Sequence, residues 1–143
     1  MFSIEDDEVI KEAIFLDTSG GIRIDAVQSA LKAFALSLSR RYISDFELHL
    51  VSFDMSMYNQ LIIKPNNIAD MLTYSIMLGG GTDIHCCWDY MRTNKIKKCL
   101  ILTDGLFDYG TDPGDLDIHF LFHSQPTGIY LFSPYGKSSN YKP

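Results

Sequence analysis

Short apolar runs bounded by polar residues or glycine recur along the chain and predict β-strands. Residues 13–16 (Ala-Ile-Phe-Leu) form such a run, which Asp17 ends, and residues 99–102 (Cys-Leu-Ile-Leu) form another, which Thr103 ends. Apolar runs of this length between breakers are typical of strands that are buried on both faces of a sheet. Strand-forming residues predict further strands at residues 46–53, 61–63, 118–122 and 129–132.

Apolar residues at helical spacing predict three helices between these strands. The first covers residues 26–41, with Asp25 as its cap. The second begins after its cap Asn67 and ends at the glycines 79–81, and the third covers residues 83–94. Their apolar residues are Val27, Ala30, Leu31, Phe34 and Leu38 in the first, Ile68, Leu72 and Ile76 in the second, and Trp88 and Met91 in the third.

The alternation of strands and helices predicts an α/β fold: a three-layer, open, mainly parallel twisted sheet with helices on both faces. The connections at residues 54–60 and 124–128 are too short for a crossover helix, so we expect antiparallel strands at the sheet edges. We expect one domain at residues 13–135, after an acidic lead-in at residues 1–12 and before a flexible tail at residues 136–143.

Composition and charge narrow the classes of partner. The chain has 143 residues, the size of one domain, and 46% of them are hydrophobic, which excludes intrinsic disorder, collagen-like repeats and coiled coil. The 12 basic and 18 acidic residues leave a net charge of −6. The only local excess of positive charge is Lys95-Ile96-Lys97-Lys98, so we expect neither nucleic acid nor a membrane surface as a partner.

Cysteine usage and the N-terminal residues predict a cytoplasmic protein. Cys86, Cys87 and Cys99 are an odd number of cysteines without the spacing of a disulfide framework, which predicts reduced thiols. Acidic residues at positions 5–8 stand where a signal peptide has basic ones. No apolar run approaches the roughly 20 residues that span a bilayer.

Three polar clusters follow predicted strands or precede a predicted helix. They are Asp17-Thr18-Ser19, Gly79-Gly80-Gly81-Thr82-Asp83 and Thr103-Asp104-Gly105. Each cluster alone is common as a helix cap, a hinge or a turn. In an open α/β sheet, however, ligands bind at the carboxyl ends of the strands, where the strand order reverses. Together the clusters offer carboxylates and hydroxyls, the hard oxygen ligands of Mg²⁺, Mn²⁺ or Ca²⁺.

In this order the clusters resemble the metal-ion-dependent adhesion site of von Willebrand factor A (VWA) domains. That family carries Asp-x-Ser-x-Ser after the first strand, a threonine in a later loop and an aspartate after the fourth strand. The corresponding residues are Asp17, Ser19, Thr82 and Asp104, and the resemblance covers residues 13–132. It is strongest to the compact bacterial VWA-like domains of unknown function, and it implies a Rossmann-like VWA fold.

The resemblance also implies the roles of these residues. Asp17, Ser19 and Thr82 would lie against or close to a bound cation, and Asp104 would act through water. Gly21 replaces the last serine of the motif, so one hydroxyl ligand is missing. Because Mg²⁺ commonly keeps several waters, a water can take that position. We therefore expect a degenerate site that binds Mg²⁺, Mn²⁺ or Ca²⁺ weakly.

The function that the resemblance implies is a non-enzymatic protein-interaction module. Neutral hydroxyl ligands leave the charge of a cation under-compensated, so an open coordination position attracts an acidic residue of a partner protein. In bacteria such domains often accompany AAA+ ATPases, which makes an AAA+ ATPase one expected partner. Two alternatives stay open: a metal-free VWA-like structural subunit, and a Mg²⁺-dependent phosphoryl hydrolase with Asp17 as nucleophile. Against the hydrolase, Ser19 stands where haloacid-dehalogenase-like enzymes carry a second aspartate.

Other reactive residues have common structural explanations. His85 and Cys86 are adjacent on a predicted helix and point about 100° apart, so they do not form a nucleophile–base pair. The histidines lack the spacing of a zinc site. Four acidic residues in a glycine- and proline-containing segment are expected to be turn residues, with an acidic rim of the site as the alternative: Asp108, Asp112, Asp115 and Asp117.

Overall fold

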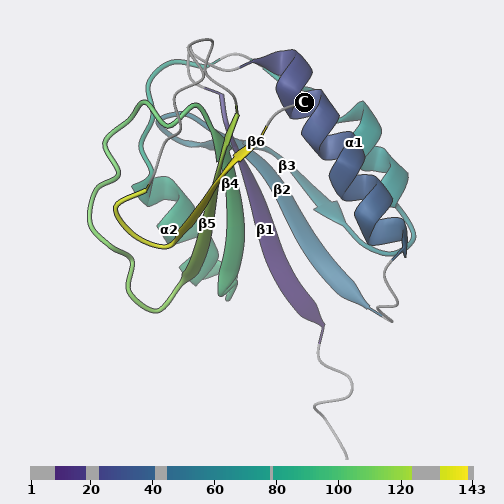
Figure 1. Cartoon of the computed structure of the whole chain (residues 1–143). Helices are drawn as coiled ribbons and strands as arrows, with labels where there is room; N and C mark the ends of the chain where they lie inside the picture. Colours follow the sequence, from purple (N-terminus) through teal and green to yellow (C-terminus); the bar gives the residue numbers. More distant parts are fainter. Residues whose placement is uncertain (1–8, 19–22, 41–44, 78, 124–132, 142–143) are drawn as a thin grey trace, which may run out of the picture.

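The computed structural model describes residues 9–18, 23–40, 45–77, 79–123 and 133–141. A six-stranded sheet has the strand order β3-β2-β1-β4-β5-β6 (Figure 1). The strands are β1 (Ile10–Asp17), β2 (Phe46–Phe53), β3 (Met57–Ile63), β4 (Lys98–Thr103), β5 (Asp117–His123) and β6 (Lys137–Tyr141). The helical segments are α1 (Ile24–Arg40), the 3₁₀ helix η2 (Ile68–Thr73) and α2 (His85–Thr93).

The sheet is mainly parallel, as predicted. β1, β2, β4, β5 and β6 are all parallel to one another, and β3 pairs antiparallel with β2 at one edge. Only three residues separate β2 from β3, and Asp54 Oδ1 accepts the backbone N–H of Ser56 within this turn. The predicted antiparallel edge is therefore confirmed at β3, because no crossover fits into so short a connection.

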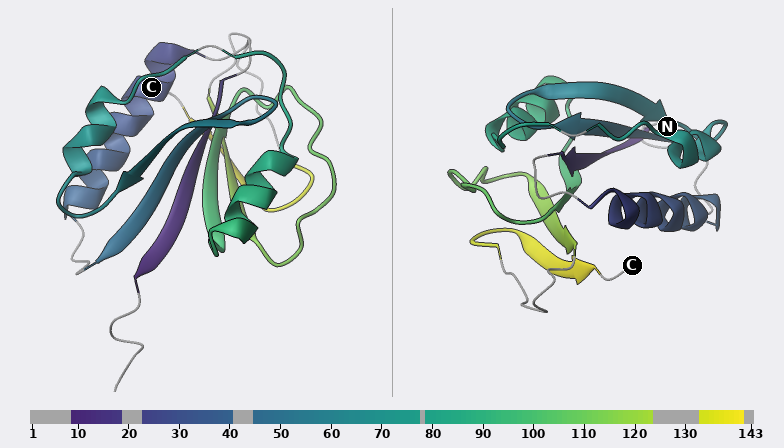
Figure 2. Two further views of the ribbon diagram at one scale, coloured as in Figure 1. Left: turned by 180° about the vertical axis from the view of Figure 1, so that it is seen from behind. Right: turned by 90° about the horizontal axis from the view of Figure 1, so that it is seen from above.

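Helices cover both faces of the sheet, which confirms the predicted three layers. α1 and η2 lie on one face and α2 lies on the other (Figure 2). Because strand side chains alternate between faces, each strand supplies two cores. Phe15 and Ile101 pack in the core under α2, whereas Leu16 and Leu102 pack in the core under α1. The apolar runs seen in the sequence are thus strands that are buried on both faces.

The predicted apolar stripe faces the sheet from α1. Val27, Ala30 and Leu31 are buried, while Phe34 and Leu38 are only partly buried toward the end of the helix. The cap prediction for Asp25 was wrong, because α1 begins at Ile24 and places Asp25 in its first turn. There its carboxylate accepts a hydrogen bond from Arg23, at 3.0 Å.

The second predicted helix is shorter and tighter than expected. The six-residue 3₁₀ helix η2 ends at Thr73, well before Ile76. The next residue, Tyr74, has an extended backbone, and its hydroxyl is held by Ser52 Oγ at 2.7 Å and donates to the carbonyl of Asn59 at 2.6 Å. Asn67 occupies the N-cap position of η2, as predicted, but its side chain makes no capping hydrogen bond. The side chain instead accepts the backbone N–H of Lys64 and donates to the carbonyl of Ile62.

The sheet extends beyond the expected bounds of the domain at both ends. Residues 136–143 were expected to be a flexible tail, but Lys137–Tyr141 form β6, which pairs parallel with β5. The predicted strand at 129–132 lies outside the described residues. Among the described residues, the edge strand next to β5 is β6, and it is parallel where an antiparallel strand was expected. Thirteen residues, 124–136, separate β5 from β6, which is long enough for a parallel crossover. β1 begins at Ile10, inside the expected lead-in.

Aromatic side chains cover the part of the α2 face of the sheet that no helix covers in the described structure. Tyr135 packs edge-on against Trp88 and Phe120, with ring centroids 6.2 and 5.7 Å apart, and its hydroxyl donates to the carbonyl of Tyr109. The ring centroids of Phe107 and Tyr109, in the segment between β4 and β5, lie 4.3 Å apart. These rings add apolar area to the core where the chain supplies no crossover helix between β4 and β5.

Aspartates fold the segment between β4 and β5 into successive turns. Asp108 and Asp112 each accept the backbone N–H two residues further on, from Gly110 and Gly114 at 2.9 Å. Asp115 lies 3.4 Å from the ammonium group of Lys97. The interpretation of these acidic residues as turn residues is thus confirmed for Asp108 and Asp112. Asp117 instead begins β5.

Within the part of the chain that the structure describes, no helix combines the length and apolar character that a membrane crossing requires.

Gly110 and Gly114 provide a test of how closely the segment between β4 and β5 packs on α2. Both have a left-handed backbone, with φ of +65° and +76°. A Cβ atom on Gly110 would lie 2.6 Å from the ring of His85, whereas one on Gly114 would meet no heavy atom within 4 Å. We expect Gly114→Ala to lower the free energy of unfolding in urea by about 1 kcal/mol and Gly110→Ala by about 2–3 kcal/mol.

The His85→Ala background separates the two costs of Gly110→Ala. Removal of the imidazole abolishes the collision but leaves the backbone cost, so both glycine variants should then lose about 1 kcal/mol. Equal losses from Gly110→Ala with and without His85 would contradict this packing.

Candidate functional site

The carboxyl ends of β1 and β4 form the point where the strand order of the sheet reverses. From β1 the chain moves to β2 on one side, and it later returns to β4 on the other side of β1. Asp17 is the last residue of β1, and Thr103 is the last residue of β4. In open α/β sheets this is where ligands bind.

The Asp17 carboxylate is buried and accepts hydrogen bonds from two hydroxyl groups. Thr103 Oγ1 donates to Oδ2 at 2.6 Å, and Thr82 Oγ1 donates to Oδ1 at 3.3 Å. Asp17 is 1% exposed and Thr103 is fully buried, while Thr82 is partly exposed. Three segments that are distant in the sequence therefore meet at one carboxylate. The sequence predicted that these three segments meet, with Asp104 as the site residue of the third segment, whereas the residue that bonds with Asp17 there is Thr103.

Asp104 lies directly after Thr103 at the same rim and is 5% exposed. Its Oδ1 accepts the backbone N–H of Leu106 at 2.9 Å, and Thr103 Oγ1 accepts that of Gly105 at 3.0 Å. These bonds fix the turn after β4 and with it the place of both side chains. Ser19 and Gly21, the remaining predicted positions of the motif, lie outside the described residues.

Asp54 positions the loop that carries Thr82, a role the sequence analysis missed. Its Oδ2 accepts the backbone N–H of Gly80 at 3.3 Å, and its carbonyl accepts that of Asp83 at 2.7 Å. The backbone N–H groups of Ser56 and Gly80 lower the pKa of the Asp54 carboxyl, so it is ionised at neutral pH. Asp54 follows β2, as Asp17 ends β1 and Asp104 follows β4, and this shared position was the available signal.

Thr18 ties the end of β1 to the same loop. Its hydroxyl donates to the carbonyl of Phe53 at 3.0 Å and bonds with the hydroxyl of Tyr58. Its carbonyl accepts the N–H of Gly79 at 2.6 Å. A Cβ atom on Gly79 would lie 2.8 Å from Asp54 Oδ2 and 3.0 Å from Thr18 Oγ1. Gly79 therefore allows a close approach of the loop to the strand ends.

The carboxylates of this rim also act on the hydroxyl of Tyr109. Burial, followed by the charges of Asp104 and Asp17, raises the pKa of the Tyr109 hydroxyl to about 12. The hydroxyl is protonated at neutral pH and donates to the carbonyl of Gly105 at 3.2 Å. It therefore closes the turn after β4 from the α2 side of the sheet.

The potential metal-ligand atoms at this rim fit a hard cation better than zinc. They are carboxylate and hydroxyl oxygens, which Mg²⁺ and Mn²⁺ accept. No three His, Cys, Asp or Glu side chains converge as a metal site among the described residues. A cation here would thus depend on hydroxyl groups beside the carboxylates. The Thr82 hydroxyl that now donates to Asp17 can rotate and present a lone pair to such an ion.

The cysteines and the other histidines do not form a second reactive site in the described structure. Burial raises the pKa of the Cys87 and Cys99 thiols, which disfavours their reactive thiolates. The Cys86 thiol donates to the Asp83 carbonyl, and the ring of His85 pairs with the Asp83 carboxylate at 3.2 Å.

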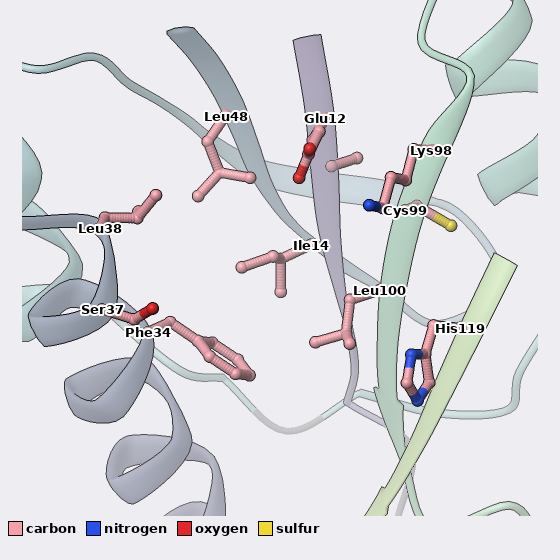
Figure 3. A pocket seen from close by; sticks show the side chains of 11 residues that line it. Glu12, Ile14, Phe34, Ser37, Leu38, Leu48, Lys98, Cys99, Leu100 and His119 are labelled. Atoms are coloured by element: carbon pink, nitrogen blue, oxygen red, sulfur yellow. The ribbon is translucent and has the colours of Figure 1, made fainter. Parts of the chain in front are cut away.

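Apart from the rim at Asp17, a hollow lies under α1, at the opposite end of the sheet from Asp17 (Figure 3). It has a volume of about 270 Å³ and an apolar lining that includes Ile14, Phe34 and Leu100. Glu12, Lys98 and His119 lie around it. Of the predicted site residues that the structure describes, Asp17, Thr82 and Asp104, none lines this hollow.

Solved structures share the fold of this chain at low sequence identity. The VWA domain of SpRpn10 matches with a TM-score of 0.62 and 8% identity, over 95% of this chain and 89% of that one. The hypothetical protein BatB from Bacteroides thetaiotaomicron matches with a TM-score of 0.54 and 14% identity, over 90% and 78%. The ArnB paralog VWA2 from Sulfolobus acidocaldarius matches with a TM-score of 0.52 and 13% identity, over 81% and 35%.

No protein-family model and no curated protein sequence matches the chain. The likeness is therefore one of structure alone, and it covers most of the described sheet and its helices. The chain thus has a VWA-like fold.

Proposed function

We propose that this VWA-like domain is a non-enzymatic interaction module that binds a divalent cation and, through it, an acidic group of a partner protein. Asp17, Ser19 and Thr82 would hold the cation, and Asp104 would act through a bound water. The observation that carries the proposal is the convergence of the Thr82 and Thr103 hydroxyls on the buried Asp17 carboxylate at the switch point of the sheet.

The proposed ligands leave the cation with residual positive charge. Asp17 would be the charged group in contact with the ion, because Ser19 and Thr82 are neutral and Asp104 would be separated from it by water. A carboxylate from another protein at an open coordination position would compensate the remaining charge. The bound cation would thereby supply a local positive charge for an acidic group on a domain whose net charge is −6.

The class of partner is a protein with an exposed aspartate or glutamate. An AAA+ ATPase is the specific partner that the resemblance to bacterial VWA-like domains suggests. We propose a cytoplasmic location for the pair, in line with the free thiols of Cys86, Cys87 and Cys99.

Cation binding is tested by calorimetric titration of the chain with Mn²⁺. We expect the wild type to bind weakly and Asp17→Asn to weaken binding by at least about tenfold, because the amide carries no charge. Asp112→Asn is the matched control: Asp112 is exposed and its turn needs only an oxygen acceptor, which the amide retains. Equal affinities of the wild type and Asp17→Asn would contradict the proposed site.

Gly21→Ser restores the hydroxyl that the motif lacks. We expect the serine to replace a water and to raise the Mn²⁺ affinity by roughly threefold or more in the same titration. Binding by Gly21→Ser without any binding by the wild type would favour the metal-free structural subunit. Unchanged affinity would show that position 21 does not face the ion.

The hydrolase alternative is tested by p-nitrophenyl phosphate turnover in Mg²⁺. We expect none, because Asp17 is 1% exposed and both of its oxygens already accept hydrogen bonds, which makes it a poor nucleophile. Turnover by the wild type that Asp17→Asn abolishes would favour the hydrolase.

A further inference from the structure

His123 is buried without a hydrogen-bond partner at the end of β5. It is 1% exposed, and neither Nδ1 nor Nε2 finds a partner among the residues that the structure describes. His49 and His119 differ, because His49 bonds with Tyr90 and Glu47, and His119 bonds with Ser139. A buried polar group without a partner destabilises a fold. Retention of such a group suggests that the imidazole has another use.

The register of the sheet brings His123 to the predicted cation site. β4 and β5 pair so that Leu102 lies beside Leu121, and both side chains face the core under α1. The last pair of this register is Thr103 with Phe122, and Asp104 and His123 each follow one residue later. Because side chains alternate between faces along a strand, His123 at the end of β5 returns to the face of Leu121. His123 therefore stands at the carboxyl end of the sheet, next to the position of Asp104.

The charges at the rim act on the imidazole. Burial is the dominant effect and lowers the pKa of His123, while the carboxylates of Asp104 and Asp17 act in the opposite direction. The ring is thus neutral at pH 7, with one N–H donor and one nitrogen that accepts a hydrogen bond.

We propose that His123 is a positioning residue of the cation site, whose imidazole accepts a hydrogen bond from a cation-bound water beside Asp104. This proposal rests on the proposed function. A water bound to a divalent cation is a strong donor, because the ion polarises its O–H bonds. Direct coordination is not proposed, since the described His, Cys, Asp and Glu side chains include no group of three that could hold one ion. Outer groups of this kind orient the ligands and raise metal affinity.

Replacement of the imidazole should separate affinity from stability. We expect His123→Leu to weaken Mn²⁺ binding about tenfold in calorimetric titration, because leucine accepts no hydrogen bond from water. In EDTA we expect the same variant to melt about 3 °C or more above the wild type, because the unpaired buried group is gone. His123→Gln keeps a donor and an acceptor, so its affinity should stay within about threefold of the wild type.

His119→Leu is the matched control, since it makes the same replacement on the same strand and face, at a residue whose partner is Ser139. It should leave the Mn²⁺ affinity unchanged. Wild-type affinity in His123→Leu would overturn the role of His123 alone. Absence of Mn²⁺ binding by the wild type would overturn the proposed function and this role with it.

A second measurement uses the wild-type chain and does not depend on the folding of a variant. Mg²⁺ is diamagnetic, so its addition can be followed in ¹⁵N–¹H spectra of the histidine rings. We expect the ring nitrogens of His123 to shift and those of His49 and His119 to stay in place. A shift of the backbone amides of Thr82 and Leu106 without a shift of the His123 ring would show cation binding in which His123 takes no part.

Discussion

The burial of the Asp17 carboxylate is the constraint on which the rest of this rim depends. A carboxylate removed from water must find hydrogen bonds within the protein, because an unpaired buried charge is far too costly. Asp17 obtains them from Thr103, at the end of the neighbouring strand, and from Thr82, in the loop before α2. The same bonds that satisfy the charge therefore join three distant segments. Any ligand of this rim meets a set of oxygens that the fold has already assembled.

The connection between β4 and β5 links the candidate site to the packing of the sheet. No helix covers the connection between β4 and β5, so rings such as Phe107 and Tyr109 complete the core there. These rings stand on turns that begin at Asp104, whose carboxylate accepts the N–H of Leu106. Asp104 thus belongs both to the turn that orders the aromatic residues and to the predicted cation site. A change at Asp104 would act on stability and on binding at once, and so would a change at the buried Asp17, which is why a binding test at either position needs a measurement of stability beside it.

The sequence predicts an element well where the element's own residues determine its structure. It predicts an element poorly where contacts with residues far away in the sequence determine it. β2 was predicted with its observed bounds, because its residues form a continuous run of strand formers that is buried between two neighbours. β6 was missed because Lys-Ser-Ser-Asn-Tyr is a polar edge strand, defined only by its pairing with β5. The early end of η2 depends on the contacts of Tyr74 with Ser52 and Asn59, which no helical pattern contains.

The same distinction applies to the rim. The encounter of Asp17 with Thr82 could be predicted, because strand ends and a glycine-rich loop fix the place of each residue in a parallel sheet. The role of Asp54 and the lack of a partner at His123 could not, since both depend on which backbone groups reach them in space. With Asp54 ionised beside Asp17 and Asp104, the rim without a cation would repel an acidic partner. On the proposed function, then, the cation would decide whether the partner binds at all, because it offsets most of this negative charge and offers the partner's carboxylate a coordination position.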